Sequence, residues 1–407
     1  MAQRRVGRDL PGHAVNGGMG RRSSVVSDLK PGGVVSVPFF DLKRQYGSIR
    51  RELDDAVRAV VESQRFILGA PVERLEAELA EDLGVAHAVG CASGTDALLL
   101  GLRGLELPAG SDVVVPAFTF FATAGAVWNA GLKPVFCDID PATFNVTAET
   151  VEAALTPDTR AVVVVHLFGQ MADMAPIQAL AEERGLAVIE DAAQAIGARQ
   201  HLDGAWLYAG AVGTAGAFSF FPTKNLGGYG DGGLMTTQDA ALAERLRKLR
   251  VHGGVQMYHH EMVGTNSRLD ALQAAVLSAK RPHLEGWKEA RQANAAAYDA
   301  ALSSLAGLAT PPVLPGNEHV YNQYTVRVAD GRRDALREFL AERDIGSGVY
   351  YPVPLHLQAC FESLGYGAGD LPASEQASAE VLSLPVFPEL TGDEREEVVR
   401  GVREFFG

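Results

Sequence analysis

From Val37 onward, short apolar runs alternate along this chain with longer stretches in which apolar residues recur every three or four positions. The short runs predict strands, and the longer stretches predict helices. Several runs are apolar without interruption, which is typical of strands covered on both faces of a sheet. Seven such strands are expected, at residues 86–92, 112–116, 134–139, 161–166, 186–190, 217–221 and 233–237.

The helical pattern is clearest at residues 48–62, 71–83 and 239–251, and Asp239 is a suitable N-cap for the last of these helices. A longer helix over residues 268–302 would lead into a second domain, with a kink or break at Pro282. The remainder predicts strands at 321–328 and 348–351 and helices at 334–343, 373–382 and 393–405.

This alternation of strands and helices predicts an α/β protein. We expect a three-layer αβα large domain with a mostly parallel seven-stranded sheet over residues 37–284, and a smaller C-terminal α+β domain over residues 285–407. Residues 1–36 are rich in Gly, Arg and Ser and have no long apolar segment. We expect them to be a flexible N-terminal extension rather than a signal peptide.

Composition narrows the possible partners. The chain has 407 residues, of which 47% are hydrophobic, so a sizeable core is available, and its formal net charge is −14. An excess of negative charge argues against nucleic acid and against a membrane surface as partners, and no apolar run is long enough to cross a bilayer. The three cysteines, Cys91, Cys137 and Cys360, are scattered and lack metal-ligand spacing. They are expected to be reduced thiols in a cytoplasmic protein without a metal site.

The most distinctive stretch surrounds Lys224. The strand at 217–221 runs into Pro222, Lys224 follows, and five glycines then fall within residues 225–233. Such a density of glycine indicates a backbone that bends sharply or approaches another group closely. A lysine amine forms imines with carbonyl compounds when its surroundings favour the neutral form. The alternative is a turn lysine in contact with water.

Polar and aromatic residues follow other predicted strands. Ser93, Gly94 and Thr95 come after the first strand and open a helix, so they predict either a phosphate site or a plain capped helix. Phe120 belongs to a run of three phenylalanines within residues 118–121, which could be core or a platform for a flat aromatic ligand. His166 ends a buried strand and is either structural or close to a ligand.

Two carboxylates, Glu190 and Asp191, end the apolar strand at 186–190, and Gln194 follows three residues later. A carboxylate buried at a strand end is costly without a partner, and a protonated ring nitrogen would be one; a helix cap is the alternative. The chain thus offers a phosphate cradle, an aromatic platform, a buried carboxylate and an imine-forming lysine. Pyridoxal phosphate requires this set of groups.

Six motifs together resemble those of the DegT/DnrJ family of sugar aminotransferases, which are pyridoxal-phosphate enzymes of fold type I. The resemblance extends from about Val37 to the C-terminus. The motifs are Ser-Gly-Thr-Asp-Ala-Leu at 93–98, Val-Pro-Ala-Phe-Thr-Phe at 115–120, Glu-Asp-Ala-Ala-Gln at 190–194, Phe-Ser-Phe-Phe-Pro-Thr-Lys at 218–224, Gly-Thr-Asn-Ser-Arg-Leu-Asp at 264–270 and Tyr-Tyr-Pro-Val-Pro-Leu-His-Leu-Gln at 350–358.

The resemblance implies roles around the cofactor ring. Lys224 would carry the cofactor as an imine and move protons during the reaction. Asp191 would pair with the pyridine nitrogen, so these two residues would be the catalytic pair. Gln194 would approach the ring oxygen, and Phe120 would stack on the ring.

The resemblance also implies how the phosphate and the substrate are bound. Gly94, Thr95 and Ser219 would hold the phosphate, and Asn266 would reach it from the other subunit of a homodimer with shared active sites.

Arg268, Tyr351 and His356 would lie near the sugar nucleotide. Many family members have His-Tyr where this chain has Tyr350 and Tyr351, which leaves a substrate contact by Tyr350 open.

The implied activity is a two-stage transamination in amino-sugar and polysaccharide biosynthesis. Glutamate is the expected amino donor, and a ketosugar linked to a nucleotide diphosphate is the expected acceptor. The run from Tyr350 to His356 favours a 3-keto sugar. The alternatives are a 4-ketosugar or cyclitol aminotransferase, a dehydratase, and a non-catalytic regulatory protein that binds the cofactor. The presence of Lys224 favours transamination, because the dehydrating sister group has histidine in its place.

Overall fold

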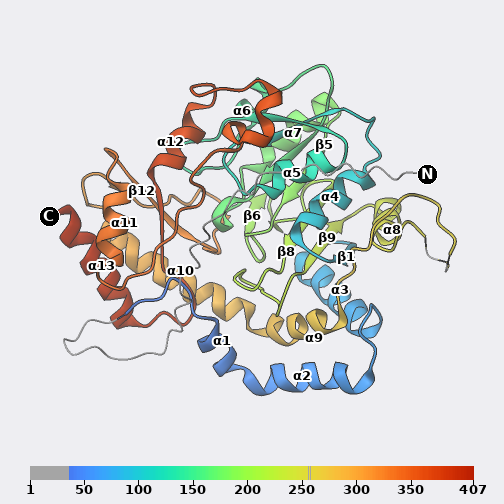
Figure 1. Cartoon of the computed structure of the whole chain (residues 1–407), viewed down its shortest axis with the longest axis horizontal. Coiled ribbons are helices and arrows are strands. Elements are labelled where there is room, and N and C mark those ends of the chain that lie inside the picture. Colours follow the sequence, from blue (N-terminus) through green and yellow to red (C-terminus); the bar gives the residue numbers. More distant parts are fainter. Residues whose placement is uncertain (1–35, 255, 257) are drawn as a thin grey trace, which may run out of the picture. The chain divides into compact units, whose positions relative to one another are not determined.

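The computed structural model describes residues 36–254, 256 and 258–407, which belong to one compact unit (Figure 1). The predicted N-terminal extension, apart from Ser36, lies outside the described residues. The division at residue 284 stays a prediction. The large sheet lies wholly before that point, and the sheet formed by β10, β12 and β13 lies wholly after it.

The helices fall between or beside the strands in chain order. Those before the last strand of the large sheet are α1 (Leu42–Ser48), α2 (Arg50–Ser63), α3 (Ala70–Leu83), α4 (Gly94–Gly104), α5 (Ala122–Asn129), α6 (Ala148–Ala153) and α7 (Met174–Arg184). Those after it are α8 (Ala240–Leu249), α9 (Ala271–Lys280), α10 (Leu284–Leu302), α11 (Arg333–Ala341), α12 (Pro372–Glu380) and α13 (Gly392–Phe406). No helix in the described ranges is long and apolar enough to cross a membrane.

The large sheet has seven strands in the order β1-β9-β8-β5-β4-β2-β3. Only β9 runs against its neighbours, so the prediction of a mostly parallel sheet is confirmed. All seven predicted strands are present within about two residues of their expected limits. They are β1 (His87–Cys91), β2 (Asp112–Pro116), β3 (Lys133–Cys137), β4 (Thr159–Val165), β5 (Ala187–Asp191), β8 (Ala215–Ser219) and β9 (Gly233–Thr237).

The sheet is covered on both faces because side chains alternate along each strand. Val162 and Val164 of β4 pack on one side with α3, α6, α7 and α9. Ala161 and Val163 pack on the other side with α4, α5 and α8. Nearly every position in these strands is therefore apolar, and the strands read as continuous apolar runs.

Short strands form two smaller sheets, in the orders β10-β12-β13 and β11-β6-β7. The first packs its apolar residues with α10, α11 and α13. Of these strands the sequence predicted only β12, because the others are two to four residues long and have no clear periodicity. Their limits are β6 (Arg199–Leu202), β7 (Ala205–Tyr208), β10 (Leu308–Ala309), β11 (Asn317–Glu318), β12 (Tyr324–Val328) and β13 (Val381–Leu384).

Other limits differ from the prediction. The strand expected at 348–351 is wrong: only Gly348 makes a bridge, to Ser383, and the next three residues line a cavity instead. The helix expected at 48–62 is α2, and a further short helix that was not predicted, α1, precedes it, separated from it at Ile49. The break at Pro282 is confirmed as a 3-10 turn between α9 and α10, and Asp239 caps α8 as expected.

Glu190 fixes the loop that follows β7. Its carboxylate accepts hydrogen bonds from the backbone N–H groups of Gly210, Val212 and Gly213 at 2.6–2.8 Å. His166 Nδ1 accepts from the Ala172 N–H, so the proton lies on Nε2, which donates to Glu190 at 2.7 Å. Burial raises the pKa of Glu190, but these bonds outweigh it and hold the pKa below its usual value.

We predict that Glu190→Gln lowers the free energy of unfolding by about 3 kcal/mol. Glutamine has the same size, but its amide nitrogen would face donors where the carboxylate now accepts. The measurement is the urea midpoint. Glu152→Gln is the matched control, because Glu152 pairs with Arg184 at 2.8 Å on the exposed surface. The control substitution should lower the free energy of unfolding by less than about 1 kcal/mol. Equal losses for both variants would contradict the prediction.

Candidate active site

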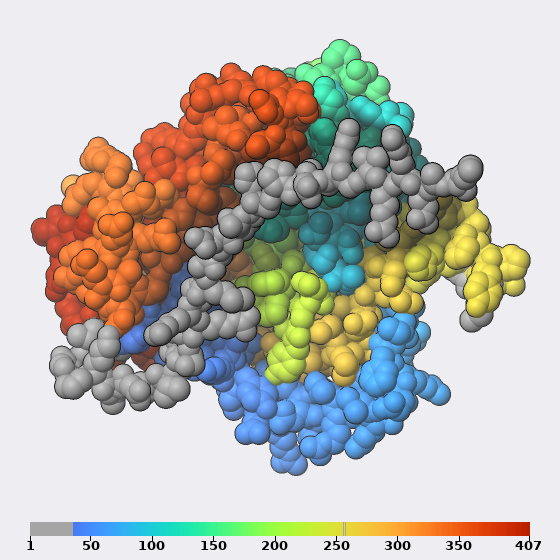
Figure 2. All heavy atoms as spheres, in the orientation of Figure 1, coloured from blue at the N-terminus to red at the C-terminus, as the bar shows by residue number. Residues whose placement is uncertain are grey.

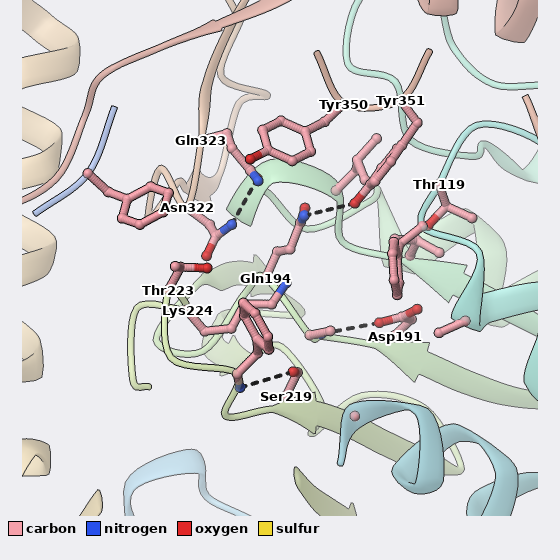
Figure 3. A pocket seen from close by; sticks show the side chains of 18 of the residues that line it. Thr119, Asp191, Gln194, Ser219, Thr223, Lys224, Asn322, Gln323, Tyr350 and Tyr351 are labelled. Atoms are coloured by element: carbon pink, nitrogen blue, oxygen red, sulfur yellow. Dashed lines mark hydrogen bonds between the residues drawn. The ribbon is translucent and has the colours of Figure 1, made fainter. Parts of the chain in front are cut away.

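A cavity of about 640 Å³ opens where β1, β2, β4, β5 and β8 end (Figure 3). These ends meet at one edge because the strands point the same way, and such an edge is where open α/β sheets bind ligands. Residues from the C-terminal part, Asn322, Gln323, Tyr350, Tyr351 and Phe387 among them, form the opposite wall. In Figure 2, residues near 225–232 (lime green) lie at the surface beside the blue residues of the first helices.

The cavity brings together eight of the eleven predicted site residues. Figure 3 shows several of them converging from different loops. The eight are Gly94, Thr95, Phe120, Asp191, Gln194, Ser219, Lys224 and Tyr351.

Lys224 is held by a tightly bonded loop. Its backbone N–H donates to the carbonyl of Phe221 at 2.9 Å, the next residue, Asn225, donates to the carbonyl of Val320 at 3.1 Å, and Lys280 Nζ donates to the carbonyl of Gly227 at 2.7 Å. Burial lowers the pKa of the Lys224 amine to about 8, against the opposing charge of Asp191. The neutral amine needed for imine formation is therefore accessible near neutral pH.

Asp191 ends β5 and faces the cavity. Its Oδ2 accepts a hydrogen bond from Thr123 Oγ1 at 2.8 Å, and its Oδ1 accepts from the Ala193 N–H at 3.2 Å. Burial raises the pKa of the carboxyl, while these bonds and the charge of Lys224 act to lower it. A cationic partner such as a protonated ring nitrogen would compensate the burial.

Gln194 has a defined orientation. Its Oε1 accepts from the Phe168 N–H at 2.7 Å, so the amide nitrogen must point the other way, where Nε2 donates to Tyr351 Oη at 3.2 Å. An amide nitrogen carries two hydrogens, and this contact uses one. The second is available to an acceptor in the cavity.

The start of α4 forms an anion site against β8. Ser93 caps the helix, accepting from the Asp96 N–H at 3.1 Å, so the first-turn N–H groups of Gly94 and Thr95 have no partner within the helix. A Cβ on Gly94 would lie 2.6 Å from Ser219 Cβ, so only glycine permits this close approach. Free N–H groups and the helix dipole favour a phosphate here, beside the Ser219 hydroxyl.

Three predicted residues do not line this cavity. His356 is buried behind it, with Nε2 3.2 Å from Glu375 Oε1. The side chains of Asn266 and Arg268 make no hydrogen bond or ion pair with other described residues. Ser267, between them, donates to Asp96 Oδ2 at 2.8 Å, which fixes this segment beside α4. The roles predicted for these three residues stay predictions.

The structure adds residues that the sequence did not single out. Thr119 lies within the motif at 115–120, whose phenylalanines carried the prediction, and Thr123 lies three residues beyond that motif. Asn322 and Gln323 come from a segment nearly a hundred residues beyond Lys224, and the Asn322 amide donates to Gln323 at 2.8 Å. No local pattern could have indicated them.

Positive charge in the cavity is scarce. Among the described lining residues, Arg291 is the one cation besides Lys224. One of its N–H groups donates to the carbonyl of Tyr321 at 3.0 Å, and its buried Nε has no hydrogen-bond partner among the described residues. The described residues contain no group of three or more His, Cys, Asp or Glu side chains that could hold a metal ion.

The fold and the cavity residues define an enzyme of the pyridoxal-phosphate-dependent aminotransferase class. A lysine with a lowered pKa, a buried carboxylate and a helix start with free N–H groups line one cavity, and these are the kinds of group that this cofactor requires. The family model described as the DegT/DnrJ/EryC1/StrS aminotransferase family matches residues 47–403. The chain belongs to this family, which confirms the predicted enzyme class, fold class and cofactor.

Several relatives cover nearly the whole described chain. A pleiotropic regulatory protein of Geobacillus stearothermophilus is 49% identical over 91% of this chain and 99% of its own. The UDP-N-acetyl-3-dehydro-alpha-D-glucosamine 3-aminotransferase of Acidithiobacillus ferrooxidans is 44% identical over 90% of this chain and 97% of its own. Among solved structures, the crystal structure of S. venezuelae DesV in complex with a ketimine intermediate matches with a TM-score of 0.88 and 44% sequence identity. The match covers 91% of this chain and 98% of the DesV chain.

We predict that the Lys224 amine titrates near pH 8 in cofactor-free protein, where burial lowers its pKa. The amine is protonated below its pKa, so its reactivity should fall as the pH drops below about 8. At pH 7.5 about a quarter of these amines are neutral, against about 0.1% for lysine in water. Trace acetylation as a function of pH, read by mass spectrometry of the Lys224 peptide, measures the midpoint.

The control for this titration is Asp191→Asn. The charge of Asp191 raises the Lys224 pKa, so its removal should move the midpoint further down. A wild-type midpoint near 10.5, or no movement in the variant, would disprove this account of the amine.

Proposed function

We propose that this chain transfers an amino group from glutamate to the 3-keto carbon of a sugar linked to a nucleotide diphosphate, in amino-sugar biosynthesis in the cytoplasm. The observation that carries the proposal is the convergence of Lys224, Asp191 and the free first-turn N–H groups of α4 on one cavity. Pyridoxal phosphate, when bound, supplies an electron-accepting ring.

The protein side chains have separate tasks. Lys224 would hold the cofactor through its amine, and the same amine would move a proton at the reacting substrate carbon. Asp191 would hold a proton at the ring nitrogen, so that the ring could accept electrons. Acid–base catalysis by a positioned group contributes roughly 10²–10⁴-fold.

The outer part of the cavity suits a sugar. Asn322 and Gln323 offer amides, and the Asn322 Oδ1 is buried without a hydrogen-bond partner among the described residues. The Tyr350 ring stacks on Phe39, with centroids 6.1 Å apart, and forms an apolar wall beside these amides. Sugars combine hydroxyl groups with apolar faces. The relative that acts on a 3-dehydro sugar supports the 3-keto position.

A second candidate is a regulatory protein that binds the cofactor without turnover. The relative from Geobacillus stearothermophilus, described as a pleiotropic regulatory protein, favours it. Retention of both Lys224 and Asp191 in one cavity argues for catalysis, since a protein that only binds the cofactor has no need of a proton-transfer lysine with a lowered pKa.

We predict that the protein with bound cofactor absorbs visible light, loses that band when glutamate is added, and then converts nucleotide-linked 3-ketosugars faster than 4-ketosugars. Lys224→Ala should lower turnover by at least about 10²-fold and should remove the cofactor link that borohydride reduces. Product analysis by mass spectrometry measures the conversion. Cofactor binding without turnover on any ketosugar or cyclitol ketone would favour the regulatory alternative.

We also propose a homodimer in which each chain completes its partner's active site. A nucleotide diphosphate is strongly anionic, and the described cavity offers two cations, Lys224, which is needed for chemistry, and Arg291. The side chains of Asn266 and Arg268 have no hydrogen-bond or ion-pair partner among the described residues, although Ser267 anchors their segment. Arginine can pair with a diphosphate through two hydrogen bonds. A two-fold axis would bring these side chains to the partner's cavity.

This arrangement predicts that two inactive variants restore activity when mixed. The pair is Lys224→Ala and the double variant Asn266→Ala/Arg268→Ala. A heterodimer has one site with all the lesions and one intact site, so random exchange should return about a quarter of wild-type activity. Tagged chains verify the exchange. Verified exchange without recovery would overturn the shared site, and activity of the double variant alone would show that these side chains are dispensable.

A further inference from the structure

Two threonine hydroxyls lie next to Asp191, and the proposed reaction does not use either of them. Thr119 follows β2 and lines the cavity, and Thr123 lies in the first turn of α5. Both are buried, with exposed fractions of 3% and 0%. Thr119 Oγ1 lies 3.2 Å from Thr123 Oγ1, which lies 2.8 Å from Asp191 Oδ2.

The direction of these hydrogen bonds follows from the chemistry of the groups. An ionised carboxylate can only accept, so Thr123 donates its proton to Asp191 Oδ2. The Thr123 oxygen then has no proton left for Thr119 and must accept from it. The result is a directed chain in which Thr119 donates to Thr123 and Thr123 donates to Asp191.

Such a chain favours the charged form of its last member. A hydrogen bond donated to a carboxylate stabilises the ionised state, and a donor that is itself an acceptor is polarised and strengthened. The other charged groups around Asp191 are Lys224 in the cavity and the His166–Glu190 pair behind the sheet. The hydrogen bond to Oδ2 comes from Thr123, and the hydrogen bond to Oδ1 comes from the Ala193 N–H.

We propose that Thr123, supported by Thr119, is a positioning residue that lowers the proton affinity of Asp191 and so keeps the shared proton on the cofactor ring nitrogen. The inference rests on the proposed function, because it concerns the pyridine ring that Asp191 is expected to meet. Without the Thr123 hydroxyl, Asp191 would bind the proton more tightly, and the ring would accept electrons less well. The carboxylate would then be held only by the bond from the Ala193 N–H to Oδ1.

The test uses the enzyme loaded with pyridoxal phosphate that is labelled with ¹⁵N in the ring. The ¹⁵N chemical shift reports directly whether the ring nitrogen carries the proton. Wild type should show the protonated shift, and Thr123→Val, which keeps the shape but removes the hydroxyl, should move toward the unprotonated shift. The kcat should fall about ten-fold with little change in KM, as expected for loss of one hydrogen bond to a charged group.

Two variants separate positioning from simple packing. Thr123→Ser retains the hydroxyl and should restore the ¹⁵N shift and most of kcat. Thr325→Val is the matched control, because Thr325 is equally buried and bonded to Ser383 at 2.8 Å, away from the cavity. It should leave the ¹⁵N shift unchanged.

If Thr123→Val does not fold, Thr119→Val decides the question, since it leaves the bond from Thr123 to Asp191 in place. It should move the ¹⁵N shift in the same direction by a smaller amount. A wild-type shift in the folded, loaded Thr123→Val or Thr119→Val enzyme would overturn the inference. Failure of the wild-type chain to bind the cofactor would instead overturn the proposed function.

Discussion

The structure depends on one electrostatic constraint: a buried carboxylate, Asp191, and a partly buried amine, Lys224, lie together at the edge of a sheet. Burial disfavours the charged form of each, lowering the pKa of the amine and raising that of the acid, while their mutual attraction opposes both shifts. The balance produces an amine that can lose its proton near neutral pH. A group so placed is poorly suited to stability and well suited to carbonyl chemistry.

The adjacent residue shows how the same strand serves stability. Because side chains alternate along a strand, Glu190 points to the side packed with α7 and Asp191 to the side of α4 and α5. The Glu190 carboxylate accepts four hydrogen bonds and is fully satisfied within the protein. The Asp191 carboxylate accepts two hydrogen bonds, so it can accept another from a group in the cavity. Two neighbouring carboxylates therefore have different functions, set by the sheet.

The sequence could predict the large sheet and most of the cavity because both depend on local patterns. Buried parallel strands are continuous apolar runs, and their ends, where Ser93, Asp191 and Lys224 follow, are the edge that holds the ligand. Long-range contacts could not be predicted in this way. Asn322 reaches the cavity through tertiary packing alone. Of the residues expected to form a strand at 348–351, only Gly348 pairs, and the other three line the cavity instead.

The described cavity offers groups suited to the cofactor, but little positive charge for the proposed substrate. Free N–H groups at the start of α4 can bind one phosphate without a cation, because a helix end supplies partial positive charge. A nucleotide diphosphate would add further negative charge, and Arg291 is the one lining cation among the described residues besides Lys224. Arg268 has no partner within the described chain, although its neighbour Ser267 is firmly held. An anchored segment with an unpaired guanidinium is expected where a second molecule supplies the anion, and this supports completion of the site across a dimer.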